Sequence, residues 1–208
     1  MVSETREPLS LITWAVAARP LPGQSVSGDH YVVGQIPNGV LVAVIDGLGH
    51  GPEAAAIART AGQVFEEYAS EAPAPLLKRC HKRLLGTRGA AISLAVFNGQ
   101  DNTLTWLGVG NVEGAFFRRD VKNTPSRVSL LVRAGVVGYQ LPALQASVVS
   151  IAQGDMLIVA TDGIRTEFTQ EIAVGQQPQQ VAERVLSAYG KATDDALVLA
   201  VNYHGIPS

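Results

Sequence analysis

The fold of this chain is constrained most by a long central stretch of short β-rich segments with no helix between them. The apolar runs are separated by short turns that contain Gly and Asn, and they lie at 90–97, 103–109, 112–118, 128–132, 147–151 and 156–160. Strands joined by tight turns pair antiparallel, whereas a doubly wound parallel sheet needs a helix between most of its strands. We therefore expect antiparallel sheets with helices packed outside them, which is an α+β fold.

The flanking regions supply the helices and the remaining strands. A helix is expected after Pro52, a second before Gly86, and a turn at Pro37-Asn38-Gly39. Residues 72–75 read as a break between the first two helices. The expected helices are 53–69, 76–85 and 179–189, and the further strands are 9–18, 30–35, 40–45 and 196–202.

Composition favours one globular domain over residues 1–208. Hydrophobic residues make up 47% of the chain and charged residues 16%, with a formal net charge of −2, so nothing indicates a nucleic-acid partner. A single cysteine, Cys80, excludes an intramolecular disulfide and a Cys-rich zinc site. No apolar run of about 18 residues predicts a membrane span, and residues 1–8 lack the pattern of a signal peptide. We expect a cytoplasmic protein.

Several aspartates lie where an apolar run meets a loop. Asp46 and Asp162 each end such a run and precede Gly, Asp194 and Asp195 precede the last run, and Asp29 precedes the second. Strand ends are rigid, so they can direct carboxylates toward a common point. Clustered carboxylates repel one another unless a cation joins them, and oxygen ligands suit magnesium, manganese or calcium better than zinc. The alternative is that each Asp-Gly is a simple turn.

The loop that follows Asp46 is rich in glycine, with the sequence Gly47-Leu48-Gly49-His50-Gly51-Pro52. Glycine lets the backbone approach a ligand closely. A plain strand-to-helix turn is the other interpretation. The spacing of a nucleotide-binding phosphate loop is absent, since no Gly-Lys-Ser or Gly-Lys-Thr follows.

Taken together, these motifs resemble the metal-dependent protein phosphatases (PPM family), and within them the SpoIIE-like branch with its Asp-Gly-x-Gly-x-Gly loop. The resemblance covers roughly residues 25–201. The motifs that carry it are Gly28-Asp29, Asp46 to Gly51, Thr161-Asp162-Gly163 and Asp194-Asp195. The segments 88–93 and 107–112 further resemble the short stressosome phosphatases of that branch.

The resemblance implies a four-layer α/β/β/α sandwich with a site for two Mn²⁺ or Mg²⁺ ions at one end of the sheets. Asp46 is expected to bridge the two ions and the carbonyl of Gly47 to bind the second. Asp162 and Asp194 are expected to bind the first, and Asp29 to hold a metal-bound water. The implied reaction is hydrolysis of a phosphate ester by a metal-activated water.

Three positions depart from the family pattern. Leu48 stands where the classical branch has a histidine that can act as general acid, and His50 is the candidate to replace it. Leu197 stands where Thr or Ser is common. The phosphate-binding arginine of the classical branch has no clear counterpart, and Arg19 is a candidate only by its location.

The expected function is that of a protein serine/threonine phosphatase. The resemblance implies phosphorylated STAS-domain scaffold proteins of the stressosome as substrates, and we expect a monomer. One alternative substrate is an anti-sigma-factor antagonist. A different alternative is a phosphoprotein-binding module without catalytic activity.

Overall fold

The computed structural model describes residues 2–5, 11–120, 126–170, 172 and 175–206. Two sheets lie face to face. The strands of the first sheet run in the order β1 (Val2–Thr5), β2 (Ile12–Arg19), β12 (Ala196–Tyr203), β11 (Met156–Ala160), β7 (Glu113–Phe117) and β8 (Arg127–Leu130). The second sheet has the order β10 (Ser147–Ser150), β6 (Thr103–Val109), β5 (Ala90–Asn98), β4 (Gly39–Gly47) and β3 (Asp29–Ile36), and the short β9 (Val132–Arg133) pairs with β6.

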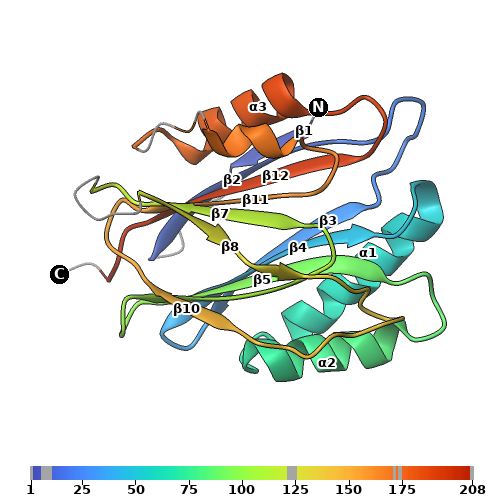
Figure 1. The fold of residues 1–208 in the computed structure, drawn as a ribbon, viewed down its shortest axis with the longest axis horizontal. Helices are drawn as coiled ribbons and strands as arrows, with labels where there is room; N and C mark the ends of the chain where they lie inside the picture. The colour runs from blue at the N-terminus through green and yellow to red at the C-terminus, as the bar shows by residue number, and fades with distance from the viewer. Residues whose placement is uncertain (1, 6–10, 121–125, 171, 173–174, 207–208) are drawn as a thin grey trace.

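Helices cover the outer face of each sheet (Figure 1). Helices α1 (Gly51–Glu67) and α2 (Pro73–Leu84) pack on the second sheet, while α3 (Pro178–Tyr189) and the short 3₁₀ helix η1 (Thr166–Gln170) pack on the first. The layers therefore follow the order helix, sheet, sheet, helix, which confirms the predicted α/β/β/α sandwich. No helix in the described ranges is long and apolar enough to cross a membrane.

Buried apolar side chains form three layers that hold this arrangement together. One lies between the two sheets, one between the second sheet and α1 and α2, and one between the first sheet and α3. The continuous apolar run of β4 is explained by this position, because its residues from Gly39 to Ile45 are buried on both faces of the sheet. The ends of this doubly covered sheet are correspondingly rigid.

The predicted elements agree with the structure apart from their ends and four corrections. Helix α2 begins at Pro73, inside the segment expected to be a break, because the first turn of a helix does not need the N–H that proline lacks. The predicted strands at the N-terminus did not include β1, and residues 9 and 10 of the strand expected at 9–18 lie outside the described residues. The 3₁₀ helix η1 was also not predicted.

The single strand expected at 128–132 is two strands in different sheets. Strand β8 pairs antiparallel with β7 in the first sheet, whereas β9 pairs parallel with β6 in the second. The chain crosses between the sheets at Leu131, whose side chain is exposed and whose carbonyl oxygen accepts a 3.0 Å hydrogen bond from Nε1 of Trp106. The expectation of purely antiparallel sheets is therefore wrong at β9.

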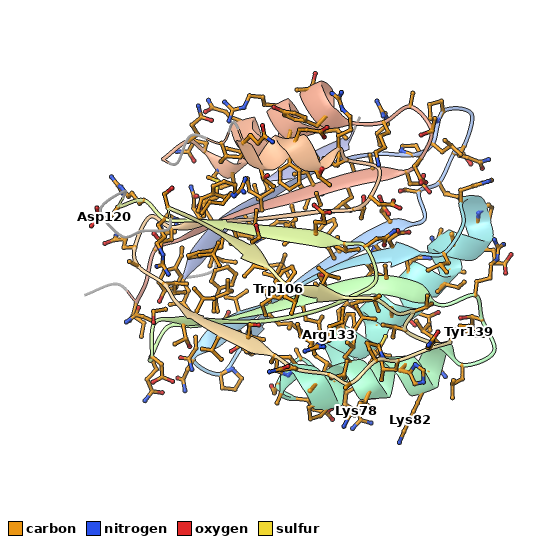
Figure 2. The ribbon with its side chains drawn as sticks, viewed as in Figure 1. Lys78, Lys82, Trp106, Asp120, Arg133 and Tyr139 are labelled. Atoms are coloured by element: carbon orange, nitrogen blue, oxygen red, sulfur yellow. The ribbon has the colours of Figure 1, made fainter. Side chains whose placement is uncertain are left out.

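Trp106 fills the centre of the layer between the sheets (Figure 2). It projects from β6 in the second sheet onto Gly114 of β7 in the first, and a side chain at Gly114 would overlap the indole ring. The absence of a side chain at this position is what lets the two sheets close over the tryptophan.

We predict that Gly114→Ala lowers the free energy of unfolding by about 1–3 kcal/mol, because the added methyl group overpacks the core. Urea unfolding followed by tryptophan fluorescence measures it. Gly34→Ala in β3 is the matched control, since a side chain there meets no atom within 4 Å. Equal stabilities of the two variants would contradict this account of the core.

Candidate metal centre

Four aspartates come together where both sheets end. Asp29 begins β3 and Asp46 lies near the end of β4, while Asp162 follows β11 and Asp194 precedes β12. The loops that carry them gather at the right-hand end of the sandwich in Figure 1. We call Asp29, Asp46, Asp162 and Asp194 the carboxylate cluster, and all four residues are partly buried.

Strand register places the first two members of the cluster side by side. Asp29 and Asp46 are directly opposite each other in the antiparallel β3–β4 pair. Side chains opposite each other across two antiparallel strands have Cβ atoms about 4.5–5.5 Å apart. Because strands alternate their faces with a period of two, this register also fixes both carboxylates on the same face of the sheet.

Thr161 connects the two halves of the cluster across the sandwich. Its hydroxyl donates a 2.8 Å hydrogen bond to Oδ2 of Asp29 in the second sheet. The same hydroxyl oxygen accepts a 2.9 Å hydrogen bond from the N–H of Leu197 in the first sheet. Leu197 itself is buried in the layer between the sheets, so its side chain serves packing.

Asp162 is held in place by two neighbours that the sequence did not single out. Nδ2 of Asn111 donates a 2.6 Å hydrogen bond to Oδ2 of Asp162, and Nζ of Lys191 donates a 2.5 Å hydrogen bond to its carbonyl oxygen. Asn111 follows Gly110 in a turn with φ of 104°, and Lys191 follows Gly190 at the end of α3. The sequence offered Asn111 only as one residue of the segment 107–112 that resembles the stressosome phosphatases, and it gave no signal for Lys191.

Asp195 has a structural part in the site. It is buried, and its two carboxylate oxygens accept hydrogen bonds from the N–H groups of Leu21, at 2.7 Å, and Gly28, at 2.8 Å. These bonds fasten the β2–β3 loop to the start of β12. Gly28 in turn accepts a 3.1 Å hydrogen bond from the N–H of Gly47, so the loop reaches the glycine that follows Asp46.

The glycines after the aspartates permit close backbone contacts. A side chain at Gly47 would overlap the carbonyl of Ala54 in α1, and one at Gly163 would overlap the carbonyl of Asp195. Only a residue without Cβ lets α1 and the start of β12 approach this closely. The Asp-Gly pairs are therefore more than turn dipeptides, because their glycines bring the elements of the site together.

The candidates for proton transfer and phosphate binding lie at the edge of this site. His50 is the exposed residue that precedes α1, and its side chain makes no capping hydrogen bond to the helix. Nη2 of Arg19 donates a 2.5 Å hydrogen bond to the carbonyl oxygen of Lys191. Arg19 thus contributes to holding the α3–β12 loop.

Burial and electrostatic repulsion together shift pKa values within the carboxylate cluster. Burial, followed by the charges of Asp162 and Asp194, raises the pKa of Asp46 to about 8. Burial and the charge of Asp46 raise the pKa of Asp29 well above its usual value, against the hydrogen bond from Thr161. Burial and Asp194 also raise the pKa of Asp162, and Lys191 opposes this shift. Such a cluster favours protons or another positive charge among its members.

The donor set fits a hard divalent cation. In the described part of the chain, no group of three or more His, Cys, Asp or Glu side chains is arranged to hold a metal ion, so the aspartates as they stand do not form a complete protein cage. Mg²⁺ and similar ions do not require such a cage, because they retain several waters and are usually held by one or two carboxylates. Oxygen ligands from carboxylates and from the carbonyl of Gly47 satisfy this chemistry.

The raised pKa values predict a specific pH dependence for the metal-free protein. A carboxyl group whose pKa is higher in the folded state than in the unfolded state stabilises the fold at low pH and loses that contribution as pH rises through its folded-state pKa. For Asp46 this window runs from its usual value of 3.8 to about 8. In a chelating buffer, we expect the stability of Asp46→Asn relative to the parent to increase between pH 4 and pH 8, measured by urea unfolding.

Asp101→Asn is the control for this experiment, since Asp101 is exposed in the turn at the opposite end of β5. Its stability relative to the parent should not change over the same pH range. A constant difference between Asp46→Asn and the parent would show that Asp46 is not destabilised by its neighbours.

The sequence matches one family model and one curated phosphatase. The family model described as Stage II sporulation protein E (SpoIIE) matches residues 37–204. The phosphoserine phosphatase RsbX of Bacillus subtilis (strain 168) is 25% identical over 176 residues, which cover 83% of this chain and 85% of RsbX.

Solved structures agree with this assignment. A crystal structure of RsbX in complex with magnesium superposes with a TM-score of 0.85 at 22% identity, covering 97% of this chain and all of that one. A chain from a structural study of the bacterial stressosome, described as a modular system adapted to control secondary messenger signalling, superposes with a TM-score of 0.82 at 24% identity, covering 92% of this chain and 99% of that one. The chain described here belongs to the SpoIIE family, whose model matches most of its length.

Proposed function

We propose that this chain is a metal-dependent phosphatase that hydrolyses phosphoserine or phosphothreonine on other proteins, and that residues 1–208 act as one catalytic domain. The observation that carries the proposal is the carboxylate cluster, in which four side chains from separate strand ends of both sheets gather at one end of the sandwich. The similarity to the phosphoserine phosphatase RsbX over most of both chains supports it.

We assign the carboxylate cluster as the site of two Mn²⁺ or Mg²⁺ ions. Asp46 would hold both ions, the carbonyl of Gly47 the second, and Asp162 with Asp194 the first. Asp29 would orient a water ligand. Divalent cations at such a site offset charge on phosphoryl oxygens and lower the pKa of water toward neutrality. The magnesium in the RsbX crystal structure supports the choice of a hard cation.

The residues of this chain would contribute orientation and charge. The hydrogen bond from Thr161 fixes one oxygen of Asp29, and the hydrogen bond from Asn111 fixes one oxygen of Asp162. Ligands fixed in this way need no reorganisation when the substrate arrives. His50, exposed at the start of α1, is the candidate to protonate the leaving serine or threonine oxygen.

For the substrate, we propose phosphorylated STAS-domain scaffold proteins of the stressosome. Two similarities support this choice, one to RsbX and one to a chain from a stressosome study. A phosphoprotein substrate also agrees with the open form of the site, since the aspartates are only partly buried and lie at an end of the sandwich.

We predict that Asp46→Asn lowers the rate of Mn²⁺-dependent hydrolysis of a phosphorylated STAS scaffold at least about a hundredfold, because it removes the charge shared by both ions. Phosphate release measures the rate, and circular dichroism verifies that the variant is folded. Asp101→Asn, at the opposite end of β5, should retain the parental rate.

Three outcomes of this assay are distinguishable. Parental activity in Asp46→Asn would show that the assigned site is wrong. Hydrolysis of a phosphorylated anti-sigma-factor antagonist, but not of the scaffold, would reject the substrate and retain the enzyme. Tight binding of phosphoprotein without turnover in excess manganese would instead identify a binding module.

A second prediction concerns the support of Asp162. Asn111→Ala should weaken Mn²⁺ binding by about 10–100-fold, the usual effect of removing a hydrogen bond that orients a metal ligand. Isothermal titration calorimetry with Mn²⁺ measures the affinity. Asn98→Ala is the control, because Asn98 makes its hydrogen bonds in the turn at the far end of β5. Unchanged affinity in Asn111→Ala would show that this hydrogen bond does not support metal binding by Asp162.

A further inference from the structure

A short segment between α2 and β5 is fixed against the loop that follows Asp46. The N–H of Leu48 in that loop donates a 3.0 Å hydrogen bond to the carbonyl oxygen of Gly89. The N–H of Gly89 donates a 3.0 Å hydrogen bond to the hydroxyl of Thr87, and Ala90 pairs with Val137 on its other side. Arg88 therefore projects from a backbone that is held on both sides and joined to the metal centre.

The side chain of Arg88 lies over the glycine-rich loop. Its guanidinium contacts Gly49 so closely that any side chain at that position would overlap it, and Gly49 has φ of 98°. Gly49 is two residues beyond Gly47, whose carbonyl is a proposed metal ligand. The same short loop therefore contains a proposed metal ligand and contacts the side chain of Arg88.

In this structure Arg88 forms an ion pair with Glu53 in the first turn of α1. Both side chains are well exposed, at 49% for Arg88 and 62% for Glu53. Exposed ion pairs contribute little to stability, so the guanidinium can exchange this partner at small cost. A guanidinium has five N–H donors in a planar fork, which matches two oxygens of a phosphoryl group.

Two other cations near the carboxylate cluster already have backbone partners. Lys191 donates to the carbonyl oxygen of Asp162, and Arg19 donates to the carbonyl oxygen of Lys191. These contacts fix the loop that carries Asp194. Arg88 differs because its partner is an exposed carboxylate, which a substrate anion of higher charge can replace.

We propose that Arg88 binds the phosphoryl group of the substrate at the rim of the metal centre, and that Glu53 is its counter-ion in the substrate-free protein; this inference rests on the proposed phosphatase function. The chain thereby gains a phosphate-binding arginine between α2 and β5, in place of the one expected near the N-terminus.

The test compares kinetics on two substrates, a phosphoserine peptide and p-nitrophenyl phosphate, which shares only the phosphoryl group with the peptide. Arg88→Ala should raise KM about tenfold for both, with kcat nearly unchanged, because a charge-assisted hydrogen bond present in both ground and transition states is lost. Arg88→Lys should recover part of this loss, since lysine retains the charge without the fork.

Glu53→Gln distinguishes phosphoryl binding from a structural ion pair. If Arg88 binds the phosphoryl group, removing its competitor should lower KM, by up to about fivefold. If the ion pair only braces the loop, Glu53→Gln should impair activity as Arg88→Ala does. An equal rise of KM in Arg88→Ala and Glu53→Gln would overturn the proposal. A rise of KM in Arg88→Ala for the peptide alone would also overturn it, because Arg88 would then bind a carboxylate that flanks the phosphoserine in the peptide.

Arg79→Ala is the control, because Arg79 of α2 forms an arginine–glutamate ion pair with Glu71 in the loop between α1 and α2. It should leave both KM values unchanged. Mn²⁺ affinity measured by calorimetry should be the same in Arg88→Ala and the parent, and a lower affinity would indicate a distorted loop and contradict the proposal.

A failure of the proposed phosphatase function can be distinguished from a failure of the Arg88 assignment. If the parent hydrolyses neither substrate in excess manganese, the proposed function is wrong. Calorimetric binding of the phosphoserine peptide to the parent and to Arg88→Ala then tests Arg88 separately, with about tenfold weaker binding expected in the variant and equal binding overturning the assignment.

Discussion

The fold holds several negatively charged aspartates close together, and it must oppose their repulsion. Four partly buried aspartates and the buried Asp195 share one end of the sandwich, and burial together with their mutual repulsion raises the pKa values of Asp29, Asp46 and Asp162. Repulsion of this kind persists only when the surrounding structure is stable enough to oppose it. The opposing stability comes from three apolar layers that lie on both sides of each sheet and hold the strand ends in position.

Small residues and hydrogen bonds convert those layers into a defined site. Gly47 and Gly163 let neighbouring backbones approach, and the hydroxyl of Thr161 joins the two sheets directly beneath the carboxylates. These contacts add specific links between strand ends that the apolar layers alone hold together without fixing individual side chains. The contacts of Gly47, Gly163 and Thr161 therefore shape the fold and also position the carboxylates that would bind a cation.

The sequence predicted the layers and the aspartates because both have strong local signals. Uninterrupted apolar runs identify strands buried on both faces, and an aspartate after such a run must lie at a strand end. The division of residues 128–132 between two sheets had no local signal, because one continuous strand and two short strands in different sheets show the same short apolar run. Leu131 crosses between the sheets for a tertiary reason, the burial of Trp106.

The roles of the supporting residues could not be predicted from the sequence, for a related reason. Asn111 and Asp162 are 51 positions apart, and Arg88 and Glu53 are 35 apart. A polar residue beside a glycine is common in any loop. Only the paired strands bring each residue to its partner, so its role becomes visible once the topology is known.

The fastening of the β2–β3 loop by Asp195 has a consequence for the order of events during synthesis. The loop is synthesised before its two hydrogen-bond acceptors, which belong to a residue made about 170 positions later. Until Asp195 has been synthesised, the β2–β3 loop lacks the bonds that fasten it to the start of β12. The arrangement of Asp29 beside Asp46 is therefore completed only after the chain has been made as far as β12.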